Sequence, residues 1–210
     1  MAVERIRCGM VNCWLIRGAD GSVLVDAAVP RYKDQIYDRV KDCNVRLILL
    51  THGHPDHVGN AAYLAERLGA PVAMHGADME LVKNPKGRKL YADTALGKFL
   101  LGGTERSLYK PHKFELSVAF KGGEKLDEYG VEARIVALPG HTEGSVGVLA
   151  GDEMIVGDAM FNVLKPTVAR MYEDRDVMMD SVTHIRLTGC KRILPGHGGA
   201  FGVERFFAGG

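Results

Sequence analysis

Three histidines and one aspartate stand within a single short stretch, Thr51 to Asn60, which reads Thr-His-Gly-His-Pro-Asp-His-Val-Gly-Asn. Imidazole and carboxylate groups are the ligands that zinc and neighbouring divalent metals take from proteins. Packed together without a metal, such groups would repel one another or lose hydration without compensation. The apolar run Arg46 to Leu50 precedes the stretch, so the side chains stand where a buried strand opens into a loop. The spacing therefore predicts a metal site.

Three further candidates follow along the chain, each beside a glycine that lets the backbone approach closely. They are His141 in Leu-Pro-Gly-His-Thr-Glu-Gly-Ser, Asp158 in Ile-Val-Gly-Asp-Ala and His197 in Leu-Pro-Gly-His-Gly. A single histidine or aspartate at the end of a strand is ordinary. In this order, after the stretch that begins at Thr51, the three residues indicate one shared site.

The complete pattern resembles that of the metallo-β-lactamase superfamily, which is His-X-His-X-Asp-His followed by a histidine, a bridging aspartate and a last histidine. The resemblance covers nearly the whole chain. It implies an α/β fold, a four-layer αββα sandwich of two mixed β-sheets flanked by helices, with a two-metal site at one edge. By matching positions, it implies that one metal is held by His52, His54 and His141 and a second by Asp56, His57 and His197. Asp158 would bridge the two metals.

Asp26 has no place in that ligand set, although it stands at the end of a strand ahead of the first loop. We expect it to accept a hydrogen bond from a ligand histidine and so to fix the tautomer of the ring. Asp26, Asp56 and Asp158 are the carboxylates that we expect to serve the chemistry. The remaining histidines stay outside the set, and two of them are expected at the surface, namely His112 and His184.

The elements that must position these residues follow from turn residues and from apolar periodicity. We expect strands at Val11–Arg17, Ser22–Asp26, Arg46–Leu50, Pro71–Met74, Glu115–Phe120, Val131–Leu138, Ser145–Ala150, Glu153–Gly157 and Lys191–Leu194. We expect helices at Pro30–Asp42, Ala61–Leu68 and Arg175–Leu187. The same order of elements occurs twice, in residues 13–54 and 146–197. This echo is compatible with a duplication that would set two sheets face to face.

The pattern weakens between Gly76 and Lys113, where a polar stretch with proline and glycine precedes an amphipathic run. In a compact domain a segment of this kind is usually a lid or an insertion on the substrate side. We therefore expect residues 76–113, and in particular Phe99, Leu100 and Leu101, to cover part of the mouth of the site.

Composition limits the other classes of function. The chain has 210 residues, 46% of them hydrophobic, which suits one domain spanning residues 1–210. Lysine and arginine number 27 against 26 aspartates and glutamates, so no net field favours nucleic acid or an anionic membrane. There is no signal-peptide pattern and no apolar run that could span a bilayer. Together with four scattered cysteines, these features predict a cytoplasmic protein with a small-molecule substrate; the oligomeric state is open.

The expected reaction follows from the metals. A divalent metal lowers the pKa of a bound water toward ~7, so that metal-bound hydroxide is available without a protein nucleophile. Within the superfamily, the stretch around His141 together with a bridging Asp158 resembles the small glyoxalase II-like hydrolases. The resemblance implies a hydroxyacylglutathione hydrolase-like metallo-hydrolase that cleaves an ester-, thioester- or lactone-like bond. Glyoxalase II proper has a C-terminal helical extension that binds glutathione, so the substrate itself is left open.

Two other reactions compete with hydrolysis. The superfamily also includes iron-dependent dioxygenases, in which the first set of ligands and the aspartate hold a single iron. Phosphodiesterases and ribonucleases are a further alternative, but no basic groove or RNA-binding arm is visible. The cofactors are expected to be two divalent ions, with zinc as the first choice and iron or manganese as alternatives, because all three accept these ligands.

Overall fold

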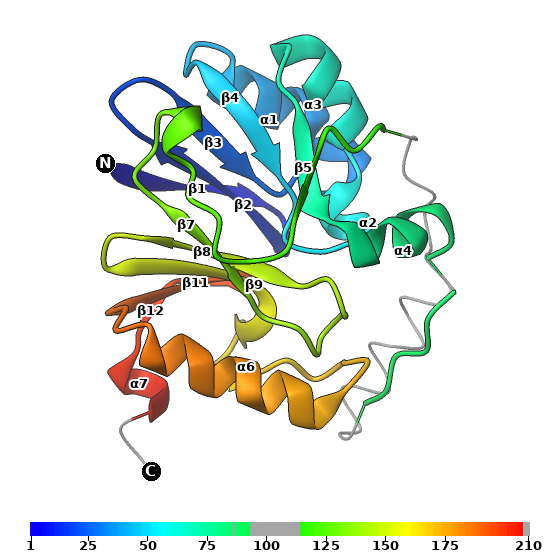
Figure 1. The fold of residues 1–210 in the computed structure, drawn as a ribbon, viewed down its shortest axis with the longest axis vertical. Coiled ribbons are helices and arrows are strands. Elements are labelled where there is room, and N and C mark those ends of the chain that lie inside the picture. Colours follow the sequence, from blue (N-terminus) through cyan, green and yellow to red (C-terminus); the bar gives the residue numbers. More distant parts are fainter. Residues whose placement is uncertain (86, 93–113, 208–210) are drawn as a thin grey trace.

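The N-terminal part of the chain forms a sheet with helices packed on its outer side (Figure 1). The structure, a computed structural model, describes residues 1–85, 87–92 and 114–207. In spatial order the strands of this part are β6, β5, β4, β3, β2 and β1. Their bounds, with those of the helices between them, are β1 (Ala2–Cys8), β2 (Val11–Arg17), β3 (Ser22–Val25), α1 (Lys33–Val40), β4 (Val45–Leu49), α2 (Pro55–Val58), α3 (Ala61–Leu68), β5 (Val72–His75), α4 (Met79–Lys83) and β6 (Val118–Phe120).

The C-terminal part forms a second layer of strands, and the long helix α6 covers its outer side at the bottom of Figure 1. Its strands follow the order β11, β9, β8 and β7, while β10 pairs with β9 and β12 with β11. The elements are β7 (Arg134–Ala137), β8 (Val146–Ala150), β9 (Glu153–Asn162), β10 (Thr167–Val168), α6 (Arg175–Leu187), β11 (Arg192–Gly198), β12 (Phe201–Gly202) and α7 (Glu204–Phe207). Short 3₁₀ helices occupy Pro30–Tyr32, Gly76–Asp78 and Asp127–Tyr129.

Three separate apolar clusters show that the layers are stacked as helix, sheet, sheet and helix. Successive residues of β2 alternate between clusters: Leu15 packs with the residues of α1 and α3, while Ile16 packs between the two layers of strands. In β9 the middle cluster includes Ile155, and Val156 faces the side chains of α6. This alternation is the pattern of sheets buried on both faces. The predicted four-layer αββα sandwich is therefore confirmed.

The two layers are joined where β2 meets β11. Val11 pairs with His197 at this junction. The amide of Asn12 donates hydrogen bonds to the carbonyls of Pro195 and Gly198, at 2.9 and 2.8 Å, and the indole of Trp14 donates to the Pro195 carbonyl at 3.3 Å. One strand of each half is thus fixed to the other beside a predicted metal ligand.

The repeated order of elements is present in space. In the first half β2 is antiparallel to β3, and β3 is parallel to β4 across α1. In the second half β8 is antiparallel to β9, and β9 is parallel to β11 across α6. Each half therefore delivers an aspartate from its second strand and one or more histidines from the strand or loop after its helix. The echo in the sequence corresponds to a real similarity of topology.

The strand boundaries differ from expectation at β9 and β11. Glu153–Gly157 and Lys191–Leu194 were predicted, but β9 runs to Asn162 and β11 to Gly198, so that Asp158 and His197 lie within strands. The pairing of the two strands shifts register on both sides of Pro195. Both predicted strand ends, Gly157 and Leu194, lie at this irregularity, beyond which the two strands continue. Strand β1 was missed because its exposed edge carries charged residues in place of an apolar alternation.

The segment expected to be a lid is described only in part. Residues 76–83 are helical, with a 3₁₀ turn that leads directly into α4, which the weakened sequence pattern did not indicate. Phe99, Leu100 and Leu101 lie outside the described residues, so their role at the mouth of the site stays a prediction.

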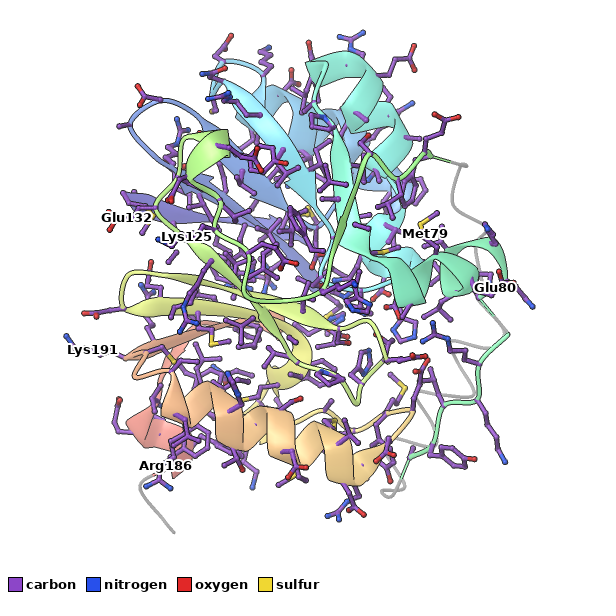
Figure 2. All side chains as sticks on the ribbon, in the orientation of Figure 1. Met79, Glu80, Lys125, Glu132, Arg186 and Lys191 are labelled. Carbon is purple, nitrogen blue, oxygen red and sulfur yellow. The ribbon has the colours of Figure 1, made fainter. Side chains whose placement is uncertain are left out.

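Charged side chains lie at the periphery. Figure 2 shows Lys125, Glu132, Arg186 and Lys191 pointing away from the strands, and each of these residues is exposed. His184 on α6 is also exposed, as expected.

Across the described ranges, none of the helices has both the length and the apolar character that crossing a membrane requires. All four cysteines carry free thiols.

Candidate metal centre

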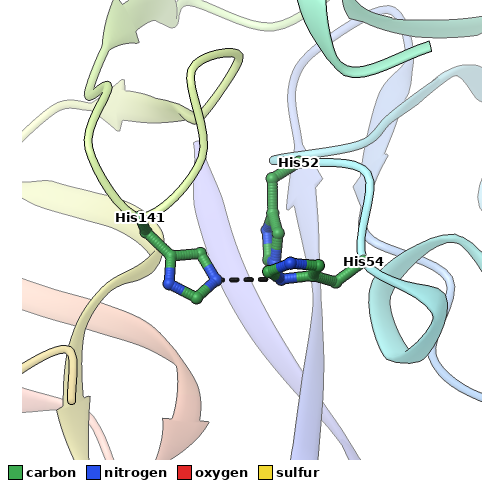
Figure 3. Close-up of side chains that lie close together, drawn as sticks. All are labelled: His52, His54 and His141. Carbon is green, nitrogen blue, oxygen red and sulfur yellow. Dashed lines mark hydrogen bonds between the residues drawn. The ribbon is translucent and has the colours of Figure 1, made fainter. Parts of the chain in front are cut away.

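The first group of site residues consists of three histidines from two loops. His52 and His54 follow β4, and His141 comes from the loop between β7 and β8. One ring nitrogen from each histidine can be chosen such that the three nitrogens all lie within 4.8 Å of one another. His141 Nε2 is 3.0 Å from His54 Nδ1, and Figure 3 shows the three rings converging from opposite sides. The structure thus brings together residues almost ninety positions apart.

The second group lies directly beside the first. Asp56 and His57 belong to the short helix α2, which begins with Pro55, a residue whose fixed φ suits a first helical position. His197 comes from β11, with its Nε2 3.4 Å from an Asp56 oxygen and 3.4 Å from His57 Nε2. These three residues form another set that could hold a metal ion.

Asp158 lies between the two groups. Its carboxylate oxygens are 3.3 Å from His57 Nε2, 3.3 Å from His197 Nε2 and 3.7 Å from His141 Nε2. All seven ligand candidates from the sequence are therefore in one cluster. His75 is outside these groups and accepts a hydrogen bond from the amide of Ala77.

Where β9 pairs irregularly with β11, the side chain of Asp158 points into the cluster. Gly157, immediately before it, has φ +51°, a left-handed conformation that favours glycine, and a Cβ there would lie 2.8 Å from the Thr51 side chain. On β11, a Cβ at Gly196 would lie 2.3 Å from an Asp158 oxygen. Two glycines therefore make the space that this carboxylate occupies.

Hydrogen bonds outside the cluster fix the tautomers of the histidines. Each of four rings has an acceptor beside its Nδ1, so Nδ1 carries a proton and Nε2, which is directed inward, is the nitrogen that loses its proton when the ring is neutral. The pairs are His52 with the Thr51 hydroxyl at 3.0 Å, His57 with Asp26 at 2.7 Å, His141 with the Met171 carbonyl at 2.8 Å and His197 with the Met10 carbonyl at 2.9 Å. The Nε2 atoms of these rings are therefore the ones that face the cluster and could bind a metal from the neutral form.

Asp26 organises the first loop, and the hydrogen bond that was expected of it is present. Its fully buried carboxylate accepts from His57 Nδ1 and also from the amide and hydroxyl of Thr51, at 2.8 to 3.0 Å. Because the Thr51 hydroxyl donates its only proton to Asp26, its oxygen must accept from His52 Nδ1. Asp26 therefore orients the His57 ring directly and the His52 ring through Thr51. Sequence reasoning missed this role of Thr51.

Buried atoms of the cluster lack partners in a way that fits a cation. His52 Nε2, His54 Nε2 and Asp158 Oδ1 are buried and have no hydrogen bond. Leaving such atoms unsatisfied costs roughly 1–3 kcal/mol each. Nitrogen and carboxylate oxygen are suitable ligands for zinc, iron or manganese. The residues present therefore fit divalent metal ions.

The cluster also divides electrostatically in the metal-free protein. Burial lowers the pKa of His52 well below its usual range, with a further contribution from His57, and lowers the pKa of His54 to about 3. Burial is the largest cause and acts in the same direction on His57 and His197, but the neighbouring carboxylates, Asp158 foremost, together outweigh it and raise the pKa of His57 well above its usual range and that of His197 to about 10. His52 and His54 are thus neutral at neutral pH, while His57 and His197 are protonated.

A buried carboxylate that sequence reasoning missed connects the ligand loops. Asp78, at the end of the 3₁₀ turn after β5, accepts hydrogen bonds from Gly53, Thr142, Gly144 and Arg88. Its only signal in the sequence is that it closely follows a strand, as Asp26 does.

Comparisons with known proteins find relatives of this chain in both sequence and structure. The model of the metallo-beta-lactamase superfamily matches residues 6–197. The uncharacterised protein Rv2581c of Mycobacterium tuberculosis is 30% identical over 171 residues, 76% of this chain and 73% of that protein. The hydroxyacylglutathione hydrolase of Acidiphilium cryptum is 29% identical over 163 residues, 76% of this chain and 52% of the enzyme. Among solved structures, TTHA1623 in a di-iron-bound form is 25% identical, with a TM-score of 0.71 and coverage of 96% of this chain and 94% of that one.

Proposed function

The chain belongs to the metallo-β-lactamase superfamily, and from this premise we propose that it is a metal-dependent hydrolase of an ester-, thioester- or lactone-like bond in a small molecule. The observation that supports the proposal is the convergence on one centre of buried ligand atoms that have no hydrogen bond, His52 Nε2 and Asp158 Oδ1 among them. A purely structural polar cluster would satisfy these atoms internally.

The proposed ligands form two sets with one shared carboxylate. His52, His54 and His141 would hold one ion and Asp56, His57 and His197 a second, with Asp158 in contact with both. Bound divalent ions would supply Lewis acidity and lower the pKa of a water molecule, which is the chemistry that hydrolysis requires. Zinc is the proposed ion; iron and manganese suit the same ligands.

The protein's own residues orient the ligands and leave one side open. Asp26 and Thr51 hold His57 and His52 in the tautomers that direct Nε2 inward. The His52 and His57 side chains are fully buried, whereas those of His197 and Asp56 are 17% and 39% exposed. We therefore place the approach of the substrate on the side of Asp56 and His197.

The substrate is proposed only as a class. The likeness to hydroxyacylglutathione hydrolase covers 52% of that enzyme, so its glutathione specificity is not carried over to this chain. We also propose a cytoplasmic location, which the four free thiols support.

Metal binding is expected to release protons at neutral pH. A ligating imidazole must be deprotonated, but His57 and His197 have raised pKa values in the metal-free protein. Affinity should therefore increase as the pH rises toward about 10, the pKa of His197, because fewer protons compete with the metal. Calorimetry of zinc binding in buffers of different ionisation enthalpy counts the protons. A binding enthalpy that is the same in every buffer contradicts this expectation.

The main alternative is iron-dependent oxygen chemistry on the same fold, and the likeness to a di-iron-bound structure is the observation that favours it. Protein purified without added metal should be analysed for its metals and then assayed with thioesters, lactones and phosphodiesters. We expect hydrolysis of a thioester or lactone without consumption of dioxygen. Oxygen uptake stoichiometric with product, from protein that is inactive with zinc, would replace the hydrolase by an oxygenase.

A further inference from the structure

A buried aspartate outside the proposed ligand set holds two ligand loops together. Asp78 is fully buried, and its Oδ2 accepts hydrogen bonds from the Gly53 amide at 2.8 Å and the Thr142 hydroxyl at 2.7 Å. Its Oδ1 accepts from the Gly144 amide at 2.9 Å and from Arg88 at 3.1 Å. One carboxylate thus receives donors from three segments of the chain.

The position of these donors relative to the ligands is specific. Gly53 lies between His52 and His54, and Thr142 directly follows His141. These three histidines make up the first ligand group and come from two different loops. Each histidine of that group is therefore next in sequence to a residue that donates a hydrogen bond to Asp78.

Both loops are packed closely against Asp78. A Cβ at Gly53 would lie 2.8 Å from the Asp78 carbonyl oxygen, and one at Gly144 would lie 2.6 Å from its carboxylate. Real Cβ contacts essentially never occur at such distances, so both positions need glycine. The close fit leaves the two loops little freedom to move relative to Asp78.

An ion pair behind Asp78 supports the same arrangement. Arg88 contacts Asp78 and also Glu173, the latter at 3.0 Å, and its side chain is 19% exposed. Glu173 in turn accepts from the amide of Glu143, in the loop of His141. The charge of the buried Asp78 is therefore paired, as a buried carboxylate requires.

We propose that Asp78 is a positioning residue that sets the separation of the two loops and thereby the affinity of the first ligand group for its metal. Residues that orient ligands from behind typically change metal affinity by ~10- to 100-fold when they are removed. None of the four hydrogen bonds reaches a member of the second group, Asp56, His57 and His197. The effect is accordingly selective, and the inference rests on the proposed metal binding.

The test measures zinc affinity with a competing chelator in two backgrounds that each retain one ligand group. In His197→Ala protein the first group remains, and adding Asp78→Ala is expected to weaken zinc binding by at least ~10-fold. In His141→Ala protein the second group remains, and the same change is expected to alter affinity by less than about twofold. The spectrum of bound cobalt(II) should change in the first background and stay the same in the second.

Two further variants separate positioning from loss of stability. Asp174→Ala removes the cap of α6, whose side chain accepts from the amides of Asp176 and Val177, and should lower Tm without changing zinc affinity. If Asp78→Ala does not fold, Thr142→Val removes one of the four hydrogen bonds to Asp78, together with the contact between the Thr142 and Ser145 hydroxyls, and should weaken zinc binding by the first group by a smaller factor. A folded Asp78→Asn variant should lie between Asp78→Ala and the parent, since it keeps one acceptor oxygen.

Equal weakening in both backgrounds, or none in either, overturns the positioning role of Asp78. If Asp78→Ala has the selective effect but the zinc-bound parent hydrolyses no thioester, ester or lactone, the proposed reaction is overturned. The role of Asp78 in positioning the loops is then unaffected. A parent protein that binds no divalent metal overturns both.

Discussion

Replacing Asp158 by asparagine is expected to lower kcat by at least ~100-fold and to weaken zinc binding. The carboxylate lies 3.3 Å from His57 and His197 and 3.7 Å from His141, so it contacts both proposed ligand groups. An asparagine keeps the shape but loses the negative charge and one acceptor oxygen, both of which favour two neighbouring cations. Steady-state kinetics on the active substrate, with metal analysis of the same sample, measures the two losses together.

Two aspartates serve as controls for this change. Asp152, in the turn before β9, forms an exposed ion pair with Lys191, and Asp152→Asn should leave both quantities unchanged. Asp26→Ala removes an orienting partner but no proposed ligand, so its loss of kcat should be smaller than that of Asp158→Asn. An Asp158→Asn protein with full activity and two bound metals would show that the carboxylate does not connect the groups.

Complete removal of metal is expected to abolish hydrolysis, and reconstitution should restore it with close to two zinc ions per chain. The reason is that seven ligand candidates are more than a single tetrahedral site can use. His197→Ala removes a member of the second group only, so its zinc content should fall to about one ion per chain. Elemental analysis after dialysis against a chelator and then against zinc gives both numbers.

His184→Ala is the matched control for that measurement, because His184 is an exposed histidine on α6. It should retain the zinc content of the parent protein. A parent protein that saturates at one zinc, with His197→Ala identical to it, contradicts a dinuclear site. Activity that survives complete removal of metal contradicts the proposed reaction itself.

Local patterns were sufficient for much of the fold. The expected bounds of β2, α3 and α6 coincide with the observed ones. Helix α3 ends at Gly69, which adopts φ +64°, and α6 begins at a side-chain cap, so both ends have a local cause. The proposed ligands were equally visible, because four of them stand within Thr51–Asn60 and the other three each follow a glycine in the order of the family's ligand pattern.

Features that depend on distant residues were not predictable in this way. Asp158 and His197 read as strand ends, since a register shift between two strands leaves no periodic signal in either one. Asp78 bonds to residues 25 and 64 positions away, and nothing near it in the sequence indicates these partners. Arg88 and Glu173, 85 positions apart, are ordinary surface charges until the fold brings them together.

The junction between the two layers of strands has an optical consequence. Trp14 is the chain's single tryptophan; it is 3% exposed, and its indole donates to Pro195 on the strand that bears His197. An indole in such an apolar setting fluoresces at shorter wavelength than one in water. The emission of the unmodified protein therefore reports directly whether β2 and β11 have docked. Refolding experiments can use it to time the assembly of the two halves against the uptake of zinc, without any attached label.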